Sequence, residues 1–252
     1  MRSGRRLQVV LTSFLIFTFL CSPLVICTSG FNVVLAASEQ TAEPEGAPNG
    51  QKVDDPYEHF NRQMFEFNDS LYFHVLKPAA QVYSAVLPAE PRAAINNGFH
   101  NLVSPARFVN FLLQVKPDKA GNEALRFVIN STMGIAGMID IAQFSFGLNN
   151  YHSDFGQTLG LWGVGSGPYL FVPVLGPSNP RDLIGFGADS VMDPLFWIPS
   201  AWWVSYSVSG MKYLNRYSLR IGEYEEVKKA SLDPYIAVRD GYIQYRAHII
   251  EK

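Results

Sequence analysis

Cysteine is nearly absent from this chain of 252 residues: it has two, Cys21 and Cys27, and both lie near the N-terminus. If the leader that contains them is removed, no disulfide framework, zinc knuckle or thiol nucleophile can form in the rest. Charged residues are also scarce, at 17%, where about 25% is usual for a soluble domain. The formal net charge of -2 excludes the basic surface of a nucleic-acid-binding protein.

The chain begins with the layout of a secretory signal. Arg2, Arg5 and Arg6 precede an apolar run from Leu7 to about Leu20, and apolar character continues well beyond it. Such a segment directs export from the cytoplasm and is removed from the mature protein. We therefore predict that residues 1–36 are a signal peptide.

The site of cleavage decides how the N-terminus is held. Val34 and Ala36 fit the small-residue rule for ordinary signal cleavage, which favours a cut near Ala36. Two alternatives stay open. One is lipidation of Cys27, although Ile26 stands where a lipoprotein signal has a small residue, and the other is an uncleaved signal that anchors the chain.

Beyond the leader, the composition predicts a tether followed by one domain. Residues 37–53 are polar and contain Pro, Gly and Glu without periodicity, which is typical of disordered chain. Residues 54–252 are enough for a single domain with a sizeable core. Outside the leader no run of about 18 uninterrupted apolar residues occurs, so a conventional transmembrane helix is not expected in the mature chain.

Helical spacing of apolar residues dominates this domain. Phe60, Met64, Phe67 and Leu71 recur at intervals of four, three and four, which places them on one stripe of a helix. No convincing run of alternating strand residues is present, so the predicted fold class is mainly α. The same helical spacing occurs at Ile95, Phe99 and Leu102; at Phe108, Leu112 and Val115; at Leu125, Val128 and Ile129; at Leu214, Tyr217, Ile221 and Tyr224, in a helix closed by Lys228 and Lys229; and at Tyr235, Val238, Tyr242, Tyr245 and Ile249.

Four pairs that end in proline predict helix starts. They are Asp55-Pro56, Ser104-Pro105, Asp193-Pro194 and Asp233-Pro234. Asp and Ser are favoured N-caps, and proline is favoured at the first helical position because its missing N–H is not needed there.

The segment from Asp154 to Asp182 is apolar and aromatic, yet glycine and proline interrupt it repeatedly. These residues prevent a continuous helix or strand. An exposed apolar loop would aggregate in water, so it needs an apolar partner. A membrane interface or a lipid-lined passage would supply one, because irregular backbone at membrane depth survives only beside protein or a water-filled cavity.

Tryptophan is concentrated in the stretch from Pro194 to Tyr213, at Trp197, Trp202 and Trp203. Tryptophan favours the headgroup level of a bilayer, and the crowding of these rings predicts an interfacial helix. The alternative is that the rings fill the core.

Catalytic motifs are mostly missing. Gly165 stands directly before Ser166, so the G-x-S-x-G elbow of hydrolases is not matched, and no phosphate-binding loop occurs. The five histidines are scattered without metal-ligand spacing. The cluster His152-Ser153-Asp154 is the only one that suggests catalysis, and helix capping explains it as well. We therefore expect no enzyme activity, cofactor or metal.

Four motifs carry a family resemblance. DPYEHFNRQMFEFND (Asp55 to Asp69), DFGQTLGLWGVGSG (Asp154 to Gly167), GPYLFVPVLGPSNPRD (Gly167 to Asp182) and DPYIAVRDGYIQYR (Asp233 to Arg246) resemble the MlaA family, also called VacJ. The resemblance runs from about Asp54 to the C-terminus in the family's order.

The resemblance implies a fold and a function. Members of this family are ring-shaped bundles of amphipathic helices that lie in the inner leaflet of the Gram-negative outer membrane, on its periplasmic side, around an amphipathic lipid channel. They are thought to withdraw misplaced phospholipids from the outer leaflet and pass them to the periplasmic carrier MlaC, often while bound to trimeric porins. Members are typically lipoproteins, and the sequence before Cys27 departs from that pattern.

Candidate site residues follow from the same motifs. The loop with Gly163, Gly165, Gly167, Pro168 and Tyr169 is the candidate for the channel, because glycine permits close approach of a lipid and flexible gating. The alternative is an ordinary tight turn.

Polar residues inside the apolar motifs form a second set of candidates, which meet lipid headgroups or pair within the protein: Asn61, Arg62, Arg181 and Asp182. Two rival functions stay open beside lipid transport: a non-transporting membrane scaffold for a porin, and a lipid hydrolase that uses the His152 region.

Overall fold

The computed structural model describes residues 54–197 and 202–251. The predicted signal peptide, Cys27 and the predicted tether lie outside these residues. Within the described chain the fold is mainly helical, as the apolar spacing predicts.

The elements follow one another closely along the chain. In order they are α3 (Glu58–Leu71), a π-helical turn (Tyr72–Leu76), α4 (Lys77–Val86), α5 (Ala89–Leu102), α6 (Ser104–Leu113), α7 (Pro117–Thr132), α8 (Ile141–Phe146), α9 (Phe155–Leu161), β1 (Leu170–Val172), β2 (Gly176–Ser178), α10 (Pro180–Met192), a 3-10 turn (Pro194–Trp197), α11 (Trp202–Ser218), α12 (Glu223–Ala230) and α13 (Pro234–Glu251).

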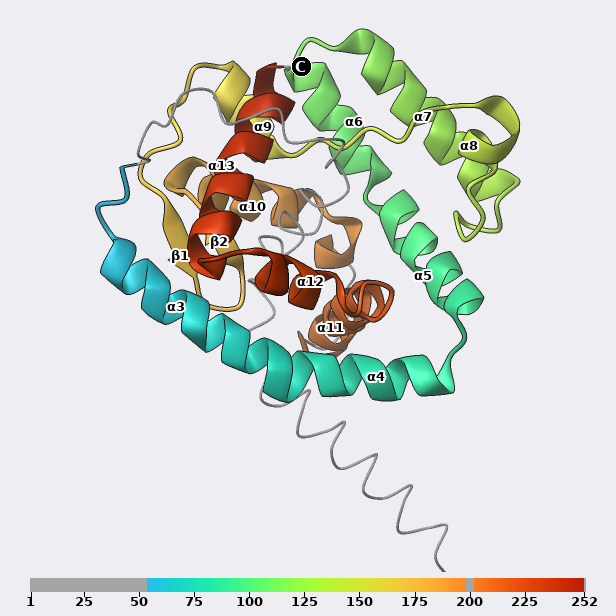
Figure 1. The fold of residues 1–252 in the computed structure, drawn as a ribbon. Helices are drawn as coiled ribbons and strands as arrows, with labels where there is room; N and C mark the ends of the chain where they lie inside the picture. Colours follow the sequence, from blue (N-terminus) through green and yellow to red (C-terminus); the bar gives the residue numbers. More distant parts are fainter. Residues whose placement is uncertain (1–53, 198–201, 252) are drawn as a thin grey trace, which may run out of the picture.

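Helices α3 and α4 form one long rod along an edge of the molecule, and α5 and α6 continue around the outside from its end, so that α10, α11 and α12 lie within this arc (Figure 1). The rod is irregular in its middle, where the backbone N–H of Lys77 donates to the carbonyl of Tyr72. Pro78 follows at once. A proline ring collides with the carbonyl four residues earlier in a regular helix, and a wider π-helical turn relieves that collision.

A short hairpin of β1 and β2 is present, which the sequence analysis did not predict. Strands of three residues are too short to show alternation. The hairpin depends on α3, whose Asn61 donates to the carbonyl of Tyr169 (3.1 Å) and accepts from the N–H of Phe171 (2.7 Å). Asn68, two helical turns later, repeats this with Val172 (3.0 Å) and Val174 (2.7 Å). The two amides thus replace a neighbouring strand.

Three sequence predictions about helix ends are wrong. The apolar spacing from Leu214 to Tyr224 does not form one helix, because Gly222 adopts φ +106° and separates α11 from α12. Asp55 does not cap α3, since its carboxylate accepts from Asn61 and from the Tyr235 hydroxyl. Ser104 does not cap α6, since its hydroxyl accepts from Arg107.

The other two caps are confirmed. Asp233 accepts from the backbone N–H of Tyr235 (3.0 Å) and Ile236 (3.3 Å) at the start of α13. Asp193 accepts from the N–H of Leu195 (2.9 Å) at the start of the 3-10 turn.

Much of the apolar stripe on α3 and on α7 faces outward, whereas that of α13 is buried. Phe60 and Phe67 on α3 are 48% and 47% exposed, whereas Asn61 and Asn68 on the same helix are buried. Leu125 and Val128 on α7 are also exposed, beside buried Glu123. A helix of a soluble protein has the opposite orientation. No helix of residues 54–197 and 202–251 combines the length and the hydropathy that a membrane crossing requires.

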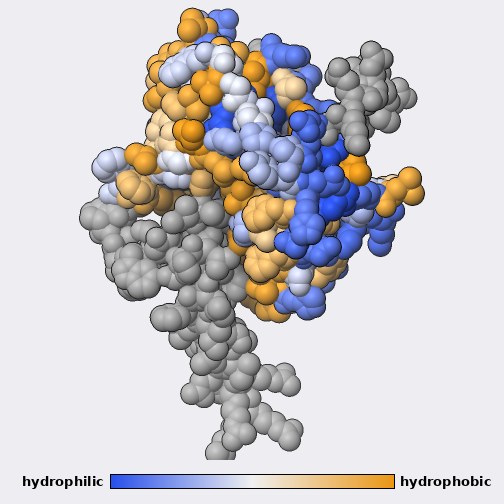
Figure 2. Space-filling model, turned by 90° about the vertical axis from the view of Figure 1, so that its left-hand side faces the viewer, coloured by the Kyte–Doolittle hydropathy of each residue, from blue (hydrophilic) through white to orange (hydrophobic). Residues whose placement is uncertain are grey.

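Apolar and hydrophilic residues occupy different sides of the molecular surface. Figure 2 shows hydrophobic residues gathered towards one side of the view and strongly hydrophilic residues towards the other. Exposed apolar side chains of α7, α8 and the turn between them contribute much of the apolar exterior, with Phe144 at 90% and Ile135 at 65% exposure. Contiguous apolar surface of this kind marks contact with a membrane or another protein.

Candidate functional site

The glycine-rich loop after α9 is exposed from Leu161 to Gly167. The indole of Trp162 donates to the carbonyl of Leu113 (3.1 Å) and ties the loop to the end of α6. Gly163 and Gly167 have φ +85° and +72°, a region that favours glycine. Gly165 has no positive φ, and a Cβ built on it would meet nothing within 4 Å. Of these three glycines, only Gly165 combines open space with a backbone conformation that a larger residue readily adopts.

Tyr169 does not belong to this exposed loop. Its side chain is 4% exposed and packs in the aromatic core with Phe171, Tyr235 and Tyr242. Its hydroxyl has no hydrogen-bond partner within the described chain. Tyr169 thus anchors the loop to the core.

Beneath the loop, Arg246 of α13 joins the N-termini of two helices. Its guanidinium contacts Asp154 at 2.7 Å and Asp182 at 2.7 Å. Asp154 caps α9 by accepting from the N–H of Gln157 (2.8 Å). Burial raises the pKa of Asp154, but the charge and hydrogen bonds of Arg246 outweigh it and hold this pKa well below its ordinary range. Asp154 is therefore an ionised partner of a buried arginine that also contacts Asp182.

The four polar candidates pair within the protein. Asn61 is buried against the hairpin. Arg62 reaches Asp233 at 2.8 Å and is partly exposed. Arg181 contacts Asp182 at 3.1 Å and donates to the carbonyl of Val164 (3.3 Å) at the glycine-rich loop. The structure thus brings Arg181 and Asp182 to the base of the loop, whereas Asn61 and Arg62 lie on α3.

The cluster at His152 has the geometry of a cap. His152 Nε2 lies 3.9 Å from Asp154, and the Ser153 hydroxyl accepts from Gln114 (2.7 Å). A nucleophile requires a base within hydrogen-bond reach, and no such bond joins Ser153 to His152. No group of His, Cys, Asp and Glu suited to a metal ion occurs among residues 54–197 and 202–251.

Of the three tryptophans, Trp197 lies in the 3-10 turn and is 68% exposed, with its indole donating to the carbonyl of Val191 (2.7 Å). Its ring meets Phe196 edge-on at 5.4 Å. Trp202 and Trp203 begin α11, and their side chains lie outside the described part of the structure. An interfacial position for these rings stays a prediction.

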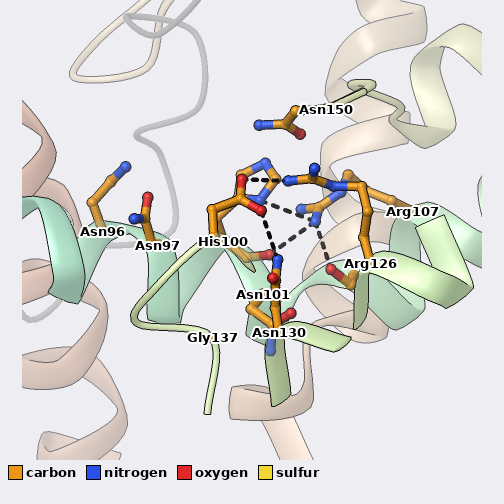
Figure 3. Close-up of a pocket in the computed structure, with 11 residues that line it drawn as sticks. Asn96, Asn97, His100, Asn101, Arg107, Arg126, Asn130, Gly137 and Asn150 are labelled. Atoms are coloured by element: carbon orange, nitrogen blue, oxygen red, sulfur yellow. Dashed lines mark hydrogen bonds and ion pairs between the residues drawn. The ribbon is translucent and has the colours of Figure 1, made fainter. Parts of the chain in front are cut away.

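A polar cavity of about 70 Å³ lies between α5, α6 and α7, and of its lining residues sequence analysis named only Ser104, as a helix cap. Figure 3 shows His100, Arg107 and Arg126 turned toward one another there. Arg107 contacts Glu123 at 2.6 Å, and Arg126 contacts Asp140 at 2.6 Å. The remaining wall includes Asn96, Asn97, Asn101, Asn130 and Asn150. In the sequence, Arg107 and Arg126 lie within helical patterns that are otherwise largely apolar. This was the signal that could have predicted a polar interior.

Asp189 of α10 has a raised pKa because it is buried. It accepts from Asn110 (2.9 Å) and from the N–H of Phe155 (3.0 Å). Burial and the nearby charge of Asp154 raise the pKa of Asp189 to about 7. The value in an unfolded chain is about 3.9, so folding favours the protonated form. The contribution of Asp189 to the free energy of unfolding is fully present below about pH 4 and is lost as the pH rises towards 7.

We expect the free energy of unfolding of the native chain, taken relative to that of Asp189→Asn, to fall as the pH rises from about 4 to 7. The difference is the quantity to measure, by urea unfolding at several pH values, because buried His100 has a lowered pKa and acts in the opposite direction. A difference that stays constant over this range would contradict the assignment.

The comparisons with known proteins agree with this architecture. The family model described as MlaA lipoprotein matches residues 53–248. The intermembrane phospholipid transport system lipoproteins MlaA of Haemophilus influenzae and Escherichia coli K12 are each 33% identical to this chain, over 75% of it and 76% of their own length. An uncharacterised protein of Rickettsia bellii is 36% identical over 78% of this chain and 76% of its own.

A solved structure has the same fold. It is described as the structural basis for maintenance of bacterial outer membrane lipid asymmetry, and it matches with a TM-score of 0.65 and 33% identity over 78% of this chain and 99% of that one. Family model, relatives and solved structure agree with the four sequence motifs, and the chain belongs to the MlaA lipoprotein family.

Proposed function

We propose that this protein transports phospholipids: it removes mislocalised phospholipids from the outer leaflet of the outer membrane and passes them to a periplasmic carrier. The observation that supports this most is the inverted distribution of side chains. Phe60 and Phe67 face outward while charged Arg107, Glu123 and Arg246 are buried. An apolar exterior suits residence among lipid chains, and a polar interior suits passage of a headgroup.

The energetics favour such an arrangement. A headgroup that crosses between leaflets unaided leaves water for hydrocarbon, which costs several kcal/mol or more. Hydrogen-bonding and charged side chains along a path remove much of that cost, while acyl chains remain against apolar surface. In this proposal the arc of α3 to α6 and the helices inside it form the ring around the channel, in the inner leaflet.

The remaining parts of the proposal follow from the family. The relatives from Haemophilus influenzae and Escherichia coli are named as lipoproteins of an intermembrane phospholipid transport system. We assign to this chain the same system, with a trimeric porin and the carrier MlaC as partners and the periplasmic side of the outer membrane as its location. A cleaved leader of residues 1–36 and a tether of residues 37–53 complete the domain plan.

The first experiment measures phospholipid exposed at the cell surface of a strain that lacks this chain. We expect a rise on deletion, reversal by the native chain, and little reversal by Gly165→Leu. The Gly165 position has open space around it, so leucine obstructs the loop without disturbing the fold.

Gly121→Leu on α7 is the matched control, because its Cβ also meets nothing within 4 Å. Normal lipid asymmetry with Gly165→Leu would contradict the role of the loop. Porin binding without any change in surface lipid on deletion would instead favour the scaffold, and altered lipid chemistry after incubation with purified protein would favour the hydrolase.

A further inference from the structure

Three cations follow one another along one side of α11. Lys212, Arg216 and Arg220 are spaced four residues apart, with Arg220 just beyond the end of the helix. This spacing brings side chains one above another. Like charges at this spacing destabilise a helix, although a cation near the C-terminus gains from the helix dipole. An exposed side chain would interact with the helix dipole equally well. The dipole therefore does not explain why Arg216 is partly buried.

Two of these cations have acidic neighbours. Lys212 Nζ lies 3.1 Å from Asp193, and Arg220 Nε lies 3.9 Å from Glu223. The carbonyl of Arg216 accepts from the N–H of Leu219, but its guanidinium makes no hydrogen bond or ion pair with any residue that the structure describes. Burial lowers its pKa, and the charge of Arg220 lowers it further. Arginine nevertheless stays protonated in proteins, so a partly buried positive charge lacks an anion.

Helix α11 packs against α5, which carries His100 of the polar cavity. Burial lowers the pKa of His100 on α5, and the charges of Arg107 and Arg216 add to this effect. Burial also lowers the pKa of Lys212, and the charges of Arg216 and Arg107 again add to it. Buried charges are screened less than exposed ones, so His100, Arg107 and the cations of α11 act on one another inside the molecule, in the region where α11 packs against α5.

The other cations around this space are neutralised. Arg107 has Glu123 at 2.6 Å, and Arg126 has Asp140 at 2.6 Å. Helix α11 is held in place beside Arg216, where Asn215 donates to the carbonyl of Arg92 on α5 (2.8 Å). The fold thus fixes the helix firmly and leaves the charge of Arg216 uncompensated.

We propose that Arg216 binds the phosphate of a glycerophospholipid inside the protein, with Lys212 and Arg220 as the neighbouring positions along its path. A guanidinium matches a phosphate with two parallel hydrogen bonds, and its charge makes them strong. This inference rests on the proposed function and names the part of the lipid that is recognised: the phosphate, which all glycerophospholipids share.

The test compares two probes of equal chain length on the purified full chain in detergent micelles. One is dihexanoylphosphatidylglycerol, and the other is dihexanoylglycerol, which lacks the phosphate. Isothermal titration should show that Arg216→Gln weakens binding of the phosphatidylglycerol by about tenfold or more and leaves binding of the diacylglycerol unchanged. Arg216→Lys, which keeps the charge, should retain more of the affinity than Arg216→Gln.

Lys228→Gln serves as a control, because Lys228 pairs with Asp69 on α3, away from the proposed site, and should bind both probes normally. Equal affinity of the native chain and Arg216→Gln for phosphatidylglycerol would overturn the inference. A parallel loss for both probes would assign Arg216 to the fold and overturn it as well.

A cellular measurement separates this inference from the proposed function. If the native chain restores lipid asymmetry and Arg216→Gln restores it equally, the inference fails while lipid transport stands. If deletion causes no rise of surface phospholipid, transport fails, and phosphate binding at Arg216 is decided by the titration alone.

Discussion

Replacing Arg246 by Met is expected to lower the free energy of unfolding by about 3–5 kcal/mol. Arg246 is 6% exposed and bridges Asp154 and Asp182 at 2.7 Å each. Its removal leaves Asp154 without an arginine partner and Asp182 with Arg181 alone, beside Asp189, on which the charge of Asp154 already acts. Urea unfolding of the purified protein in mild detergent measures the loss. Because protonation relieves the repulsion, the loss should shrink at acid pH.

Arg62→Met is the control for this experiment. Arg62 also bridges two acids, Asp233 and Glu58, at 2.8 Å each, but its side chain is 37% exposed. Exposed pairs contribute about 1 kcal/mol or less. If Arg246→Met destabilised the protein no more than Arg62→Met does, the buried network would not hold α9, α10 and α13 together.

Gly185→Ala is expected to destabilise the protein by about 3 kcal/mol, at the upper end of the cost of overpacking. Helices α9 and α10 cross at Gly185 and Gly156, where a Cβ on Gly185 would lie 2.4 Å from the nitrogen and 2.6 Å from the Cα of Gly156. Backbone atoms, unlike the end of a long side chain, cannot move aside alone. The two helices must separate. With them would move the cap at Asp154 and the cap of α10 at Asn179, whose side chain accepts from the N–H of Asp182 (2.8 Å).

Gly187→Ala tests the same helix two residues later. A Cβ there meets nothing within 4 Å, and alanine is favoured over glycine in a helix by about 1 kcal/mol. We therefore expect Gly187→Ala to keep or raise the melting temperature while Gly185→Ala lowers it. Equal melting temperatures for the two variants would show that the crossing of α9 and α10 tolerates a wider separation.

The apolar spacing predicted the existence of most helices, because period 3.6 is a local property of the chain. It placed α3, α5, α7 and α13 correctly. It failed where a backbone conformation decided the outcome: Gly222 at φ +106° divides the helix predicted from Leu214 onward. The spacing of apolar residues contains no information on where the backbone leaves the helical conformation.

The candidate site was predicted less completely. The glycine-rich loop and the pair Arg181 and Asp182, which the sequence analysis named as separate candidates, lie together in the structure. The Arg107–Glu123 pair, the asparagine-lined cavity and Arg216 were not named. Their residues are far apart in the sequence or lie within helical patterns that were interpreted by their apolar members alone.

By itself the sequence determined that this protein is mainly helical, rich in apolar residues and related to the MlaA family. It also indicated that the mature part has no conventional spanning helix. Periodicity, composition and motif order are all properties of the linear chain. Only the tertiary structure decided which face of each helix points inward. Asn61, Asn68 and Glu123 are buried while Phe60, Phe67 and Val128 are exposed. An amphipathic pattern specifies two faces but not their environment, and that choice depends on the distant partners, such as the hairpin and Arg107, that satisfy the buried polar groups.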